Sequence, residues 1–88
     1  MAKIALDIPN YTPDKGLQSS WEDGFKISCN INNEEVVISA NRDGLISLAK
    51  QLLTLAQENV PYGSHFHFNE YNGLESGSCE LVIEKNKC

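Results

Sequence analysis

Several stretches of the chain alternate between apolar and polar residues, a pattern that indicates β-strands with one buried face. They cover residues 2–8, 24–31 and 35–40, and both arms of a hairpin at 64–85. Pro9 follows the first stretch and should end that strand, because proline has no backbone N–H to donate. Asn32 and Asn33 tolerate left-handed backbone, so the second and third strands should form a hairpin around them.

The strands should each turn one set of side chains toward a core. These sets are Ile4, Leu6 and Ile8; Phe25, Ile27, Cys29 and Ile31; Val36, Ile38 and Ala40 or the alternate set; Phe66 and Phe68; and Cys79, Leu81 and Ile83. The opposite face of the last hairpin is mostly polar and carries His65, His67, Asn69, Ser78, Glu80, Val82 and Glu84. What this polar face contacts is the functional question.

One amphipathic helix is predicted over residues 41–59. Asn41 is a good N-cap, and Asp43 complements the helix dipole in the first turn. Apolar residues then recur at three- and four-residue spacing: Leu45, Leu48, Ala49, Leu52, Leu53 and Ala56. We expect this stripe to pack on a sheet and Leu52→Asp to unfold the protein, while Pro61 and Gly63 end the helix.

The order of elements predicts an α+β fold in a single domain over residues 1–88. A mostly antiparallel sheet of about five strands, in βββαββ order, would have one helix covering one of its faces. Residues 9–23 contain two prolines and no sustained period, which indicates a long loop. Trp21 is the natural anchor of that loop.

The net charge is −5 at pH 7, and the seven Lys and Arg residues are scattered. This charge argues against nucleic acid and favours solubility or a basic protein partner. Three cysteines without metal-binding spacing indicate a reduced protein, with Cys29 and Cys79 as core residues and Cys88 free. No signal peptide and no membrane-length apolar run are evident, so we expect a cytoplasmic protein.

Two histidines separated by one residue on a strand could form a metal site or a catalytic site. His65 and His67, with Glu80 as a third ligand, could bind a metal, and His67 with Glu80 or Glu70 could form a general acid–base pair. The run is similar to the His-x-His-x-His of histidine-triad nucleotide hydrolases, but Asn69 replaces the third histidine. The chain shows no nucleophile, oxyanion hole or phosphate-binding glycine loop. We therefore expect no cofactor, and a small His-dependent enzyme or metal-binding protein remains the alternative.

The loop before the last strand is acidic. Glu70, Glu75 and Glu80 cluster there, and no Lys or Arg lies between Lys50 and Lys85. This segment is either a solvated face or a docking surface for a basic partner. A homodimer through the polar face or an edge strand is a further possibility.

Two motifs resemble a known family. Arg42-Asp43-Gly44-Leu45-Ile46-Ser47-Leu48-Ala49 begins the helix, and His65-Phe66-His67-Phe68-Asn69-Glu70-Tyr71-Asn72-Gly73-Leu74-Glu75-Ser76-Gly77-Ser78-Cys79-Glu80-Leu81 spans the last hairpin. Together they resemble the immunity protein 32 family of bacterial polymorphic-toxin systems.

The resemblance implies an inhibitor that binds a cognate toxin, and many such toxins are basic nucleases. It implies partner-binding roles for His65, His67, Asn69, Glu75 and Glu80, and Glu70 of the acidic loop is a further candidate contact. For Asn72, Gly77 and Ser78 we expect a role in shaping the loop.

Overall fold

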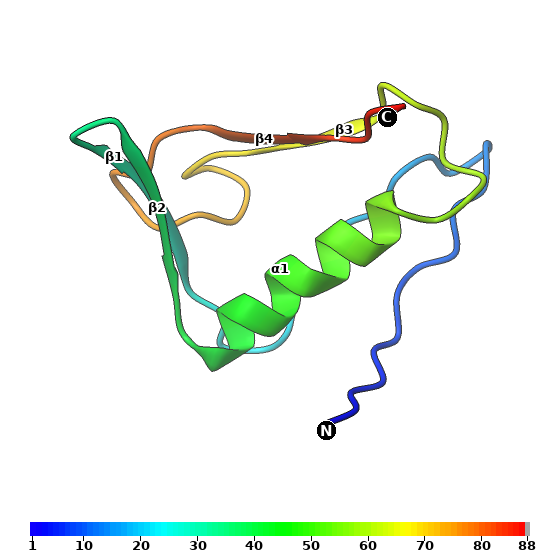
Figure 1. Cartoon of the computed structure of the whole chain (residues 1–88), viewed down its shortest axis with the longest axis horizontal. Coiled ribbons are helices and arrows are strands. Elements are labelled where there is room, and N and C mark those ends of the chain that lie inside the picture. Colours follow the sequence, from blue (N-terminus) through cyan, green and yellow to red (C-terminus); the bar gives the residue numbers. More distant parts are fainter. Residues whose placement is uncertain (88) are drawn as a thin grey trace.

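The computed structural model describes residues 1–87, so the prediction for Cys88 lies outside the described residues. The elements are β1 (Ile27–Asn32), β2 (Glu35–Ala40), α1 (Arg42–Leu55), β3 (His65–Phe68) and β4 (Leu81–Glu84). Two antiparallel hairpins, β1–β2 and β3–β4, lie at an angle to each other, with α1 running beneath them (Figure 1). The α+β class with antiparallel strands is thus confirmed.

The predicted single sheet of about five strands is wrong: within residues 1–87 there are four strands in two separate sheets. The two hairpins do not merge because the loop before β4, and not β4 itself, occupies the outer edge of β1. The backbone N–H of Glu75 donates to the carbonyl of Ile27 at 2.7 Å, and that of Cys79 donates to Cys29 at 2.8 Å. An edge that is already hydrogen-bonded cannot accept another strand.

The predicted strand at residues 2–8 does not form. Ile4 is 80% exposed, and no part of this segment joins either described sheet. The first tertiary hydrogen bonds of the chain come just after it, where the Gln57 side chain bonds the Pro9 carbonyl and the Tyr11 N–H at 3.0 and 3.2 Å. Alternation of apolar and polar residues favours an extended chain, but a strand also needs a neighbouring strand with free backbone groups to bond.

The first hairpin forms as predicted, with Ile27 opposite Ala40 and Ile31 opposite Val36. The left-handed positions of its turn are Asn33 and Glu34, at φ of 50° and 68°, one residue later than expected. In the second hairpin Phe66 lies opposite Ile83.

Helix α1 begins as predicted, because Oδ1 of Asn41 accepts a hydrogen bond from the Gly44 N–H at 2.7 Å. The predicted core stripe is wrong for most of its members, and only Leu48 packs against the core. Leu45, Leu52 and Leu53 are 54%, 45% and 49% exposed, and the fully buried side chains of the helix are mostly polar. The buried residues of α1 are Gly44, Ser47, Gln51, Thr54 and Leu55.

The long loop explains why the helix turns a polar face inward. The Glu22 N–H donates to Oγ of Ser47 at 2.8 Å, and the Ser20 N–H donates to Oε1 of Gln51 at 3.1 Å. Backbone groups that lose water where a loop packs on a helix need new partners, and these side chains supply them. An ion pair of 2.7 Å between Lys50 and Glu22 also links the helix to the loop.

The core lies between β1, β3, the helix end and the loops. Its buried apolar members are Ile27, Cys29, Leu55, Val60, Phe66, Phe68 and Leu74. Trp21 stacks on Phe25 with ring centroids 4.5 Å apart and meets Phe68 edge-on at 5.3 Å. The predicted anchoring role of Trp21 is confirmed.

In residues 1–87, no helix combines the length and the apolar character needed to cross a bilayer.

Candidate functional site

Strand β3 presents its two histidines outward. His65 and His67 are exposed, whereas Phe66 and Phe68 on the opposite face are 8% and 4% exposed. The alternation arises because successive side chains of a strand point to opposite faces. His67 lies across from Val82, which shares its outward face. The predicted division of this hairpin into a core face and an outer face is confirmed.

His67 and Glu80 come together at the surface. Nε2 of His67 lies 3.2 Å from Oε2 of Glu80, with side chains 48% and 66% exposed. His65 has a different partner, since its Nδ1 lies 3.3 Å from the Gly63 carbonyl oxygen. Across residues 1–87 no three His, Cys, Asp or Glu side chains gather as metal ligands would. In water a pair this exposed is weak and free to exchange for a partner's groups.

The loop after β3 is shaped by two asparagine side chains. Oδ1 of Asn69 accepts from the Tyr71 N–H at 2.9 Å, which is an Asx turn. Asn72 spans the loop: its Oδ1 accepts from the Asn69 N–H at 2.7 Å, and its Nδ2 donates to the His67 carbonyl at 2.8 Å. Both asparagines therefore use their side chains within the chain, which makes Asn69 a loop-shaping residue beside its predicted contact role.

The second half of the loop is also held by hydrogen bonds from side chains to the backbone. Oε2 of Glu70 accepts from the Gly77 N–H at 2.7 Å, and Oγ of Ser78 accepts from the Cys29 N–H at 3.2 Å. Ser78 thus ties the loop to β1. Gly77 has a φ of 85°, a left-handed conformation that favours glycine.

Between these ends the loop folds onto the core. Leu74 is 6% exposed and belongs to the core. Gly73 has a φ of 144°, and a Cβ there would lie 2.9 Å from Cη2 of Trp21. Tyr71, by contrast, is 88% exposed beside Glu70. Tyr71 was not among the predicted site residues, although an aromatic residue between two turn-forming asparagines of a loop motif was a usable signal.

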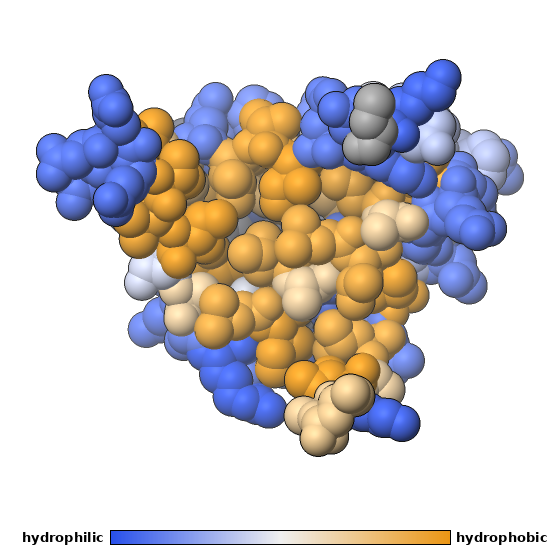
Figure 2. Space-filling model, in the orientation of Figure 1, coloured by the Kyte–Doolittle hydropathy of each residue, from blue (hydrophilic) through white to orange (hydrophobic). Residues whose placement is uncertain are grey.

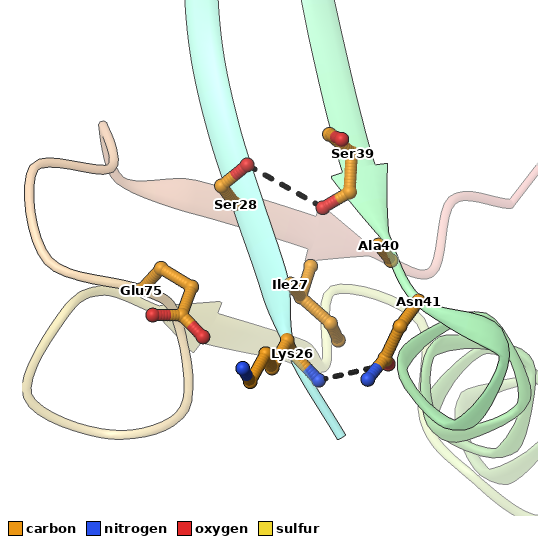
Figure 3. Close-up of a pocket in the computed structure, with 7 residues that line it drawn as sticks. All are labelled: Lys26, Ile27, Ser28, Ser39, Ala40, Asn41 and Glu75. Carbon is orange, nitrogen blue, oxygen red and sulfur yellow. Dashed lines mark hydrogen bonds between the residues drawn. The ribbon is translucent and has the colours of Figure 1, made fainter. Parts of the chain in front are cut away.

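Glu75 lies at the rim of a shallow cavity of about 400 Å³. The cavity is lined by Lys26, Ile27, Ser28, Ser39, Ala40, Asn41 and Glu75. Figure 3 shows the Glu75 carboxylate beside β1, while the Lys26 N–H donates to Oδ1 of Asn41 at 3.0 Å. The cavity is open and mostly polar, and it could receive a side chain of a partner protein.

Behind the loop, the two core cysteines are in contact. Sγ of Cys79 lies 3.4 Å from Sγ of Cys29, and Cys29 is 1% exposed. Burial raises the pKa of the Cys29 thiol, and the neighbouring Cys79 raises it further through a hydrogen bond and charge repulsion. A neutral thiol is a weak nucleophile, so Cys29 serves as a packing residue, as predicted.

Together these observations describe an exposed surface on an ordered loop. We define the β3-loop surface as the exposed residues His65, His67, Tyr71, Glu75 and Glu80 on β3 and the following loop. The side chains of Asn69, Glu70, Asn72 and Ser78 hold that loop in place.

Comparison with known proteins agrees with the motifs. No curated protein and no solved structure matches the chain. A family model described as immunity protein 32 matches residues 35–86, from β2 to just beyond β4, and so includes α1 and the whole loop. The matched region is more than half of the chain, and we conclude that the chain belongs to the immunity protein 32 family.

Proposed function

We propose that this protein is an immunity protein that neutralises a cognate bacterial toxin by direct contact through the β3-loop surface. The observation that carries the proposal is the way the loop is built. Four side chains and the buried Leu74 hold it, while Tyr71, Glu75 and Glu80 stay exposed. A binding loop ordered before association loses little entropy when it binds.

Charge indicates the kind of toxin. No Lys or Arg lies between Lys50 and Lys85, and Glu75 and Glu80 are exposed in that stretch. An acidic surface steers a basic protein toward it and raises the association rate. A basic nuclease acting in the cytoplasm is the toxin class that suits this surface best. Tyr71 would supply the aromatic contact that often dominates such an interface.

In this proposal His67 acts as a contact and not as a catalyst. Its partner Glu80 is 66% exposed, so a toxin cation can displace the imidazole at little cost. The protein needs neither cofactor nor metal for such a role.

The test pairs this protein with any toxin domain that is found encoded next to its gene. We expect one-to-one binding and protection of cells that express the toxin. The double variant Glu75→Lys, Glu80→Lys should lower the association rate at least tenfold, with a smaller effect at high salt. The matched control is Asp7→Lys, Asp14→Lys, which makes the same charge change at two exposed sites elsewhere.

Each outcome is decisive. An equal loss in the control would show that net charge matters and the β3-loop surface does not. Full protection by the Glu75 and Glu80 variant would remove this surface from the interface. An absence of binding by the unmodified protein would contradict the proposed function itself.

A further inference from the structure

The fold leaves one face of helix α1 apolar and uncovered. Apolar residues at positions 45, 49, 52, 53 and 56 lie on one side of the helix, because their spacing follows its period. Leu45, Leu52 and Leu53 are each about half exposed. The buried side of the helix is already occupied by the loop around Ser20, so this apolar side has no partner within residues 1–87.

The first hairpin extends the same uncovered face. Ile38 pairs with the buried Cys29, and Val36 pairs with Ile31, so these side chains share the inward face of the sheet. Ile31, Val36 and Ile38 are nevertheless 68%, 64% and 38% exposed. Figure 2 shows apolar side chains running from the β1–β2 hairpin across α1 toward β4. Beside β4, Leu52 and Ile83 line a groove of about 220 Å³.

We propose that this face is the interface of a homodimer, in which α1 packs antiparallel against α1 of a second copy about a two-fold axis at Ala49. The pattern of the helix is self-complementary in that arrangement. Leu45 of one copy lies against Leu53 of the other, four residues to either side of the axis. Ala49 meets its own counterpart, and its small side chain lets the two helices approach closely.

Charge at the helix ends supports a second copy as the occupant. Arg42 is exposed at the start of the stripe, and the two ion pairs formed within residues 1–87 involve other residues. The last turn of α1 contains no basic residue, and the exposed Glu58 follows it. The antiparallel pairing brings Arg42 of each copy to the negative end of the other helix, where a cation is stabilising.

The area of this apolar face sets the affinity that we expect for the dimer. The half-exposed apolar side chains offer on the order of 600 Å² per copy, which is the lower end for a specific interface. We therefore expect a dimer with a dissociation constant on the order of micromolar. This inference is independent of the proposed function, because the face and the β3-loop surface consist of different residues.

The test is sedimentation velocity on the full chain from about 1 to about 300 μM, a range that brackets the expected dissociation constant. Ala49→Glu and Ala49→Lys should each weaken the dimer more than tenfold, because like charges meet at the axis. An equimolar mixture of the two should recover dimer, which also shows that both variants fold. The matched controls Gln18→Glu and Gln18→Lys, at an exposed loop position, should dimerise like the unmodified protein.

A second variant probes the helix ends without altering the apolar stripe. Arg42→Glu should weaken the dimer several-fold and reduce its dependence on salt. A protein that stays monomeric at the highest concentration, or a mixture that recovers no dimer, would overturn the proposal. If Ala49→Glu instead lowers binding to the toxin domain while the unmodified protein is monomeric, the face belongs to the toxin and the homodimer is excluded.

Discussion

The side chain of Gln51, fully buried in α1, bonds the backbone of Ser20 in both directions. Its Oε1 accepts from the Ser20 N–H at 3.1 Å, and its Nε2 donates to the Ser20 carbonyl oxygen. Nε2 also donates to the Ser47 carbonyl at 2.8 Å. This amide, and not a leucine, is the central link between the helix and the long loop.

Gln51→Ala should therefore destabilise the protein more than Leu52→Ala. The first change leaves the half-buried backbone groups of Ser20 without these partners and should cost about 2 kcal/mol. The second removes a side chain that is 45% exposed and should cost about 1 kcal/mol or less. Urea unfolding at low protein concentration measures both. A larger loss for Leu52→Ala would show that the leucine face is the core after all.

The same relationship changes the expectation for Leu52→Asp. A carboxylate at a half-exposed position remains solvated, so the variant should keep its fold. Far-ultraviolet circular dichroism of the dilute monomer checks this. An unfolded spectrum would contradict the observed orientation of α1.

Gly73→Ala should be more destabilising than Gly77→Ala. Both glycines have positive φ, so both substitutions are strained. Only at Gly73 would the new Cβ also press on the Trp21 ring, at 2.9 Å, whereas nothing lies within 4 Å at Gly77. We expect a loss of about 1–3 kcal/mol at Gly77 and a larger loss at Gly73. Trp21 fluorescence, from the single tryptophan, should shift only in Gly73→Ala.

Asn72→Ala should loosen the loop that carries the β3-loop surface. The substitution removes the hydrogen bonds to the Asn69 N–H and to the His67 carbonyl, at a cost of about 1 kcal/mol. Amide hydrogen exchange should accelerate at Asn69 and Gly77 while α1 keeps its protection. Ser76→Ala, at an exposed position of the same loop, is the control. Unchanged exchange in Asn72→Ala would mean that Leu74 alone holds the loop.

The buried Cys29 thiol should make stability depend on pH in the alkaline range. Its pKa is raised above the ordinary value of 9.0, so the folded state keeps a proton that the unfolded state loses. Stability is therefore complete below about pH 9 and falls as the pH rises further. Cys29→Ala should be less stable at neutral pH but show a flatter decline from about pH 8 to about pH 11 in chemical unfolding. Equal slopes would rule out this contribution of Cys29.

Local patterns were sufficient for much of the fold. Alternation located both hairpins and their faces, and the N-cap at Asn41 placed the start of α1, because these features depend on neighbouring residues alone. The same holds for the site: the spacing in residues 65–81 identified the histidines, the acidic residues and the family. For Tyr71 the sequence places an aromatic residue in the loop, and only the folded loop shows that its side chain is exposed.

What the sequence by itself determined, then, is which residues share a face of each element. Only the tertiary structure decided which face of α1 is buried and which segments pair. For α1 the leucine stripe is the more apolar choice, yet Ser47 and Gln51 point inward because the half-buried backbone groups of Ser20 and Glu22 need hydrogen-bond partners. Likewise, the strand pattern at residues 2–8 finds no edge, and the loop at Glu75 takes the edge of β1. Pairing is a property of two segments, and one segment's sequence cannot specify it.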